Sequence, residues 1–153
     1  MTMGNFIPKV CIPKFLLKNV VGDGDGDDDE SWHTVDYSGK NVHLITTEES
    51  WEEKMEEANK DDKIAIVNFS ASWCSPCRTI APLFSELSMK HLSWMFLVVD
   101  VDVLSDLSTT WDIKATPTFF FLRGGKQFEK VIGANKEELQ KKVTEVVDSE
   151  TSS

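Results

Sequence analysis

From residue 42 onward, short apolar runs alternate with segments whose apolar residues recur at helical spacing. The run at 63–69 is almost continuously apolar, as is typical of a central strand covered on both faces. The elements expected in chain order are a strand at 42–45, a helix from 46, a strand at 63–69, a helix at 75–91, a strand at 95–100, a helix at 104–110, strands at 118–122 and 127–132 joined by a Gly-Gly turn, and a helix at 136–147. Strands that alternate with helices and end in a hairpin indicate an α/β fold, with a central mixed β-sheet flanked by helices on both faces.

Charge divides the 153-residue chain into unequal blocks. Residues 1–22 carry three lysines and no acid, whereas residues 23–30 carry six acids and no base. Because a Gly-Asp run cannot bury apolar area, we expect an N-terminal extension over residues 1–38, largely disordered with an acidic linker at 23–30. One domain over residues 39–153 follows. The net charge of −10 repels phosphate backbones, so no nucleic-acid partner is expected.

Targeting signals are weak in this sequence. No apolar run approaches the roughly 18 residues that a membrane-spanning helix needs. The segment 6–21 is apolar in places, but it is interrupted by Lys14 and Lys18 and by Pro8 and Pro13, unlike the unbroken core of a secretory signal. The first arginine is Arg78, which argues against a transit peptide. We therefore expect a cytoplasmic protein.

Two of the three cysteines, Cys74 and Cys77, form a C-x-x-C motif where a predicted strand gives way to a predicted helix. A thiol at a helix N-terminus faces unpaired backbone N–H groups and the positive end of the helix dipole, which favour the thiolate. Cys77 lies one turn further on, and Pro76 suits the first turn because it has no N–H to leave unpaired. The motif predicts a redox-active pair. An exposed Cys74 thiolate attacks a disulfide, and Cys77 then resolves the mixed disulfide.

Other uses of a C-x-x-C motif fit less well. A zinc site needs four ligands, and His33, His43 and His91 are dispersed along the chain, so no metal site is expected. Haem attachment requires a histidine directly after the second cysteine, where this chain has Arg78. Two structural cysteines in a buried helix stay open as an alternative.

The segment from Trp73 to Arg78 (Trp-Cys-Ser-Pro-Cys-Arg) resembles the active site of thioredoxins, and the segment 115–119 (Ala-Thr-Pro-Thr-Phe) resembles the second hallmark of that family. The hairpin turn at 124–126 and the glycine-containing segment 131–134 also match. Over residues 40–148 the amino-acid sequence is similar to that of plant h-type thioredoxins that carry an N-terminal extension. The resemblance implies the thioredoxin fold.

The same resemblance implies roles for individual residues and for partners. Cys74 is the nucleophile, Cys77 the resolving thiol, and Pro117 a cis-proline opposite them. Further implied contacts with substrate come from Trp73, Ser75, Thr116, Gly133 and Ala134. No cofactor is implied beyond the Cys74–Cys77 disulfide itself. Electrons are expected from NADPH through a thioredoxin reductase, and disulfide-containing proteins are the expected targets.

The sequence departs from the family pattern at several positions. Ser75 stands where a glycine is usual, and Thr116 replaces an isoleucine or methionine, which puts a hydroxyl near the dithiol. Asn68 stands where thioredoxins have a buried aspartate, and Val98 where a lysine is common. Because an amide cannot take a proton from Cys77, we expect slower resolution and a longer-lived mixed disulfide. A binding or holdase module with little turnover is the alternative function.

Cys11 lies in the extension among apolar residues and lysines. It is a candidate for S-acylation, which would give weak membrane association, peripheral at the plasma membrane. The alternative is a floppy tail without a role.

Overall fold

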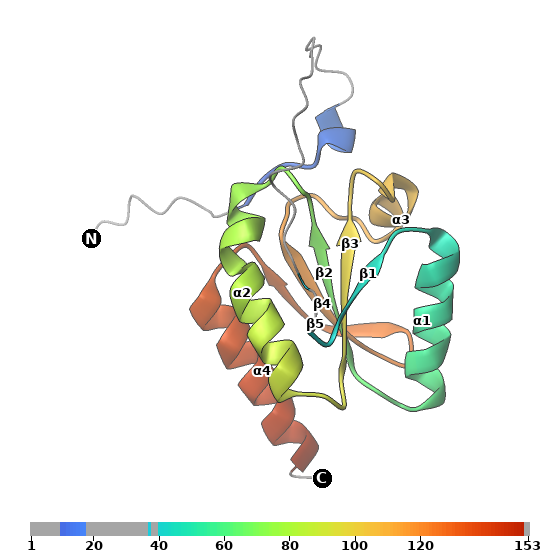
Figure 1. Ribbon diagram of the computed structural model, residues 1–153, viewed down its shortest axis with the longest axis vertical. Coiled ribbons are helices and arrows are strands. Elements are labelled where there is room, and N and C mark those ends of the chain that lie inside the picture. Colours follow the sequence, from blue (N-terminus) through green and yellow to red (C-terminus); the bar gives the residue numbers. More distant parts are fainter. Residues whose placement is uncertain (1–9, 18–36, 38–39, 152–153) are drawn as a thin grey trace, which may run out of the picture.

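The computed structural model of the chain (Figure 1) describes residues 10–17, 37 and 40–151. Its ordered elements are a 3-10 turn η1 (Lys14–Leu17), β1 (Val42–Ile45), α1 (Glu48–Lys60), β2 (Ala65–Ser70), α2 (Ser75–Lys90), β3 (Met95–Asp100), α3 (Ser105–Thr110), β4 (Thr118–Arg123), β5 (Lys126–Ile132) and α4 (Lys136–Thr151). Strands and helices therefore alternate as the sequence predicts.

The strands form one five-stranded sheet in the order β1-β3-β2-β4-β5. β1 and β2 both run parallel to β3, whereas β4 is antiparallel to β2 and β5 is antiparallel to β4. The mixed sheet expected from the sequence is confirmed. β2 is a central strand, which explains why its sequence is almost continuously apolar.

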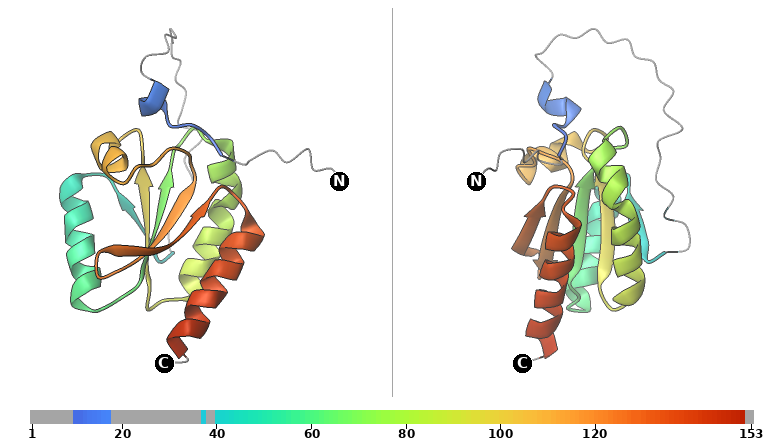
Figure 2. Two further views of the ribbon diagram at one scale, coloured as in Figure 1. Left: turned by 180° about the vertical axis from the view of Figure 1, so that it is seen from behind. Right: turned by 90° about the vertical axis from the view of Figure 1, so that its left-hand side faces the viewer.

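Each face of the sheet has its own core, because successive side chains of a strand point to opposite faces. Phe69 of β2 joins the cluster that contains Trp51 of α1 and Leu107 of α3. Ile66 belongs to the opposite cluster, which contains Phe84 of α2 and residues of α4. Figures 1 and 2 show α2 and α4 running side by side, while α1 lies away from them. Helices flank both faces, as predicted.

Several element boundaries differ from the prediction by one to four residues, and two of these differences have a clear cause in the structure. β2 begins at Ala65 because the N–H of Lys63 donates to the Ala58 carbonyl at 2.8 Å and closes the end of α1. α4 continues past residue 147 to Thr151. Its last turn is held by Glu150, which accepts a hydrogen bond from the indole of Trp94 at 3.3 Å and pairs with Arg123.

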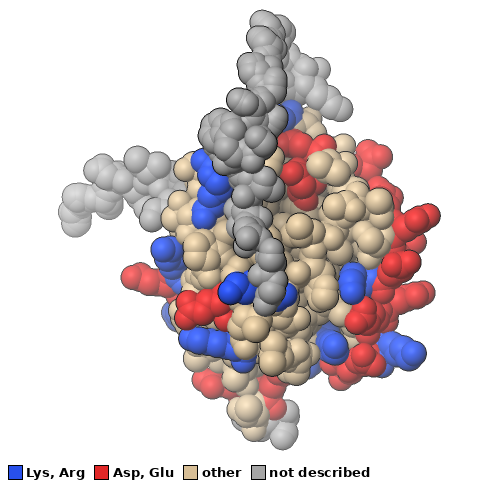
Figure 3. Space-filling model, in the orientation of Figure 1, with Lys and Arg blue, Asp and Glu red and all other residues tan. Residues whose placement is uncertain are grey.

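The surface reflects the acidic composition of the chain. Acidic side chains are dense along α1, whose sequence carries six glutamates and two lysines (Figure 3). The acidic run at 23–30 lies outside the described residues.

Candidate active site

The dithiol lies where β2 passes into α2. Cys74 is the N-cap residue of α2, and its own N–H donates to the Ala71 carbonyl at 3.1 Å. Cys77 is buried in the first turn of the helix, and Pro76 precedes it there. Both cysteines are free thiols in this structure. The predicted placement at a helix N-terminus is confirmed.

Hydrogen bonding from the Cys77 thiol is the largest of the effects that lower the pKa of Cys74, to about 6. Burial acts in the opposite direction, and contacts with Cys11 and Thr116 lower the pKa further. The pKa of Cys77 is raised by the same bond to Cys74 and by burial. One sulfur is therefore held as the anion near neutral pH, while the other keeps its proton. This asymmetry is what an attacking thiolate and a resolving thiol require.

The loop before β4 lies against the dithiol. The Thr116–Pro117 peptide bond is cis, as the resemblance implies. The Thr116 hydroxyl lies 3.6 Å from the Cys74 sulfur, so the predicted hydroxyl near the dithiol is confirmed. The N–H of Gly133 donates to the Pro117 carbonyl at 2.8 Å. The structure thus brings residues 116–117 and 133 to the side of the dithiol.

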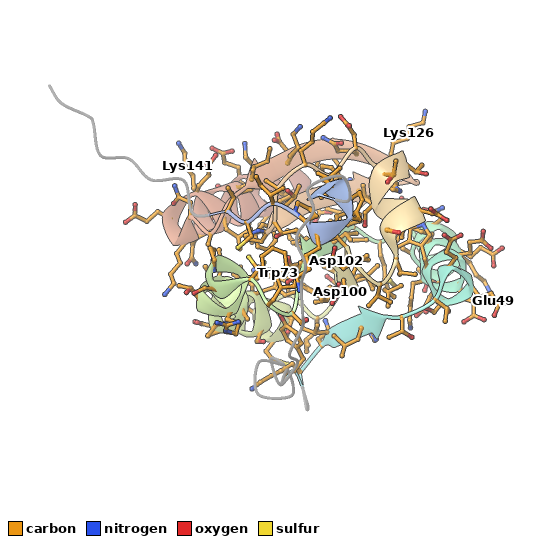
Figure 4. All side chains as sticks on the ribbon, turned by 90° about the horizontal axis from the view of Figure 1, so that it is seen from above. Glu49, Trp73, Asp100, Asp102, Lys126 and Lys141 are labelled. Atoms are coloured by element: carbon orange, nitrogen blue, oxygen red, sulfur yellow. The ribbon has the colours of Figure 1, made fainter. Side chains whose placement is uncertain are left out.

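An acidic pair that the sequence reasoning did not assign, Asp100 and Asp102, lies beside Trp73 (Figure 4). Asp102 accepts a hydrogen bond from the indole N–H of Trp73 at 2.7 Å. Asp100 accepts from the backbone N–H of Asp102 at 2.9 Å and fixes this turn. Burial raises the pKa of Asp100. The Val-Asp-Val-Asp sequence at residues 99–102, where β3 ends, is the available signal, but it does not reveal which side chain turns toward Trp73.

Asn68 lies in the middle of the sheet and is fully buried. Its neighbours across the two strand pairings are Val98 and Phe119, so both departures from the family pattern sit side by side. Neither polar atom of the amide has a hydrogen-bond partner. A buried polar group without a partner costs about 1–3 kcal/mol. No hydrogen bond joins Asn68 to Cys77; Ser70 contacts the Cys77 thiol instead and lowers its pKa.

The N-terminal extension reaches the site, which the sequence did not predict. Cys11 and Thr116 form an antiparallel bridge with N–H to carbonyl distances of 2.7 and 2.8 Å. The Cys11 thiol hydrogen-bonds with the Cys74 sulfur, and burial followed by this contact raises the pKa of Cys11 to about 12. For residues 10–17 the expectation of a floppy tail is therefore wrong.

The expectation of an exposed Cys74 is also wrong. The exposed fraction of this residue is 0 %. Cys11 and Thr116 both contact its sulfur and cover it. Spacing along the chain could not reveal this cover, because Cys11 meets Thr116 across 105 positions of sequence.

Within residues 10–17, 37 and 40–151, no group of three or more His, Cys, Asp or Glu side chains could hold a metal ion. None of the helices in the same residues has the length and hydropathy of a membrane-spanning segment.

The fold and the dithiol define the class of thiol-disulfide oxidoreductases. A family model described as Thioredoxin matches residues 42–145. Thioredoxin H9 of Arabidopsis thaliana is 63% identical over 133 residues, which cover 87% of this chain and 94% of that protein. Thioredoxin H-type of Populus jackii is 58% identical over 125 residues, 82% of this chain and 88% of its own.

The crystal structure of a poplar wild-type thioredoxin h is similar to this fold, with a TM-score of 0.69 and 61% identity. The match covers 71% of this chain and 97% of that one. The chain belongs to the thioredoxin family. It is a plant h-type thioredoxin and a thioredoxin-type disulfide reductase with Cys74 and Cys77 as its redox pair.

The first prediction concerns the ionisation of Cys74. In the wild type, the rate of Cys74 alkylation by iodoacetamide should rise with pH through a midpoint near 6. In Thr116→Val the midpoint should move upward, because the lost hydroxyl stabilises the thiolate form. The rate at pH 6 then falls while the rate at pH 9 changes little. Peptide mapping by mass spectrometry isolates the Cys74 signal.

Thr79→Val serves as the matched control, because the exposed Thr79 hydroxyl donates to the Ser75 carbonyl and not to a sulfur. Its midpoint should equal that of the wild type. A wild-type midpoint near the ordinary thiol value of about 8.5 would contradict the assignment of Cys74 as the low-pKa thiol.

Proposed function

We propose that this thioredoxin reduces disulfides of other proteins with electrons from NADPH delivered by a thioredoxin reductase. The observation that carries the proposal is the low pKa of Cys74 beside a protonated Cys77. The Cys74 thiolate attacks one sulfur of a target disulfide, forms a mixed disulfide and releases the other target sulfur as a thiolate. Cys77 loses its proton and attacks the Cys74 sulfur. This second step forms the Cys74–Cys77 disulfide and releases the reduced target.

The residues around the dithiol have distinct roles in this proposal. The backbone of Thr116 pairs with the target strand, and Pro117 leaves that backbone accessible. Trp73 shields the mixed disulfide and contacts the target, with Ser75, Gly133 and Ala134 completing the contact surface. Pro76 supports the first turn of the helix that holds both sulfurs. These roles are favoured by the position of each residue around Cys74.

We also propose that resolution is slow. The raised pKa of Cys77 means that a base must remove its proton before the second step. Asn68 cannot act as that base, since an amide does not titrate, and it has no hydrogen-bond partner through which to relay a proton. The mixed disulfide is therefore expected to last longer than in thioredoxins with a buried aspartate.

The second prediction tests the activity and the electron source. The full chain, with NADPH and thioredoxin reductase, should consume NADPH only when insulin is present, and Cys74→Ser should abolish this consumption. Dithiothreitol as reductant provides a second arm. Insulin reduction with dithiothreitol but not with the reductase would show that the electron source is wrong. Failure in both arms would contradict the reductase function and favour the binding or holdase alternative.

The third prediction concerns Asn68. Asn68→Asp should accelerate resolution at neutral pH, because a carboxylate at this buried position can take the Cys77 proton. The decay of the mixed disulfide, followed by quenched-flow mass spectrometry, measures this step directly. Asn68→Leu is the matched control, since leucine has the same number and branching of side-chain heavy atoms and no titrating group. Equal decay rates for Asn68→Asp and the wild type would refute the idea of slowed resolution.

We further propose that the protein works in the cytoplasm, with Cys11 as an S-acylation site that gives peripheral attachment to the plasma membrane. One acyl chain with nearby lysines provides only weak binding. Because Cys11 contacts Cys74 in this structure, acylation requires residues 10–17 to leave the dithiol.

The fourth prediction follows from that requirement. Hydroxylamine-sensitive acyl label should be found on the wild type in plant cells, absent from Cys11→Ser, and enriched in the membrane fraction. Wild-type protein without label, or equal membrane fractions for both proteins, would remove acylation as the basis of attachment.

A further inference from the structure

Residues 10–17, called the N-terminal strap from here on, lie across the mouth of the active site as an extended strand that ends in a turn. The two backbone hydrogen bonds between Cys11 and Thr116 are those of an antiparallel strand pair. Such pairing to an exposed backbone is how many proteins bind an extended peptide. The strap is thus bound as a peptide ligand would be, although it belongs to the same chain.

Side chains beyond Cys11 extend the contact in one direction. Pro13 is buried, and the ammonium group of Lys14 lies 5.5 Å from the centre of the Trp73 ring. The backbone N–H of Phe15 donates to Asp102 at 3.0 Å, and the Phe15 ring packs against the core cluster that includes Cys74. Figure 4 shows Trp73 and Asp102 close together under the turn of the strap.

The contact surface also continues in the other direction. A groove of about 710 Å³ is lined by Val10 of the strap and by Ala115, Gly133 and Ala134. The surface from Ala134 to Asp102 is therefore longer than the strap that occupies it. A longer extended peptide could use the part that the strap leaves open.

We propose that the N-terminal strap is an intrachain competitor that occupies the target groove, and that this groove takes extended peptides of the same chemistry. Such a peptide carries a cysteine against Cys74, a basic residue three positions later over Trp73, and an apolar residue after it. Its backbone donates to Asp102, as that of Phe15 does. The proposal rests on the proposed function, since a target groove presupposes that the dithiol acts on targets.

Burial of Cys74 explains why the strap and a target exclude one another. The Cys74 sulfur must approach a target disulfide directly, yet its exposed fraction is 0 % while the strap is bound. The Thr116 backbone groups that would pair with a target already pair with Cys11. The indole N–H of Trp73 and the Phe15 N–H both bind Asp102, so the acidic residue anchors the groove wall and its occupant together.

The fifth prediction tests this competition on the reduced full chain. Lys14→Glu combined with Phe15→Ala removes the cation–π contact and the packed ring but leaves all three cysteines unchanged. Alkylation of Cys74 should become about tenfold faster than in the wild type, because the strap no longer stays bound. The KM for a disulfide-containing target protein should fall. The matched control is Leu16→Ala, because Leu16 is 46 % exposed and should leave both values unchanged.

A peptide supplied in trans completes the test. A synthetic peptide of residues 10–17 with Cys11→Ser should slow Cys74 alkylation of the double variant, whereas the same peptide with Lys14→Glu should not. Equal alkylation rates in the wild type and the double variant, or equal slowing by both peptides, would overturn the proposal. Alkylation of Cys74 needs no catalytic turnover. The experiments can therefore contradict the competing strap and the proposed reductase function independently of each other. Rates that differ as expected without any insulin reduction would remove the proposed function and leave the competing strap in place.

Discussion

The hydrogen bond between the sulfurs of Cys74 and Cys77 is the interaction on which the chemistry of this protein depends. It is the first cause of two opposite shifts, since it lowers the pKa of one thiol and raises that of the other. The bond forms because Cys74 is the N-cap residue of α2 and Cys77 lies in the first turn of the same helix. That helix must begin directly after a buried strand, so that its N-terminus faces the surface and its remaining turns can pack on the sheet. The fold can thus be understood as a support for one sulfur–sulfur contact.

The register of the sheet explains how the loop with Thr116 and Pro117 comes to lie against the dithiol. Phe69 of β2 lies opposite Thr118 of β4 in an antiparallel pair. The residues that follow Phe69 therefore lie beside the residues that precede Thr118, at the same edge of the sheet. The pairing of β2 with β4 is therefore sufficient to place the dithiol turn against Thr116 and Pro117. The same central strand carries Asn68, whose unpaired amide is held in place by the packed strands on either side.

The sequence predicts the secondary structure well, because apolar alternation and helical spacing report directly on which face of an element is buried. Strand order could not be obtained in the same way, since pairing joins residues that local patterns do not connect. The dithiol was found from two cysteines at a strand-to-helix junction, a local signal. Asp102 and Cys11 were not placed at the site, because each reaches it through a contact distant in sequence. Cys11 meets Thr116 across 105 positions and Asp102 meets Trp73 across 29.

Covering Cys74 does not prevent its ionisation, because the cover is itself polar. Burial alone would raise the pKa of this thiol, yet the hydrogen bonds from Cys77, Cys11 and Thr116 outweigh that effect. Two of these three donors lie outside the helix, and one belongs to the extension. The largest contribution to the charge of the sulfur comes from Cys77 within the helix, whereas residues 10–17 cover the sulfur and also contribute through Cys11. When these residues leave, the hydrogen bonds from Cys77 and Thr116 remain to stabilise the thiolate, so access can open while most of the stabilisation is kept.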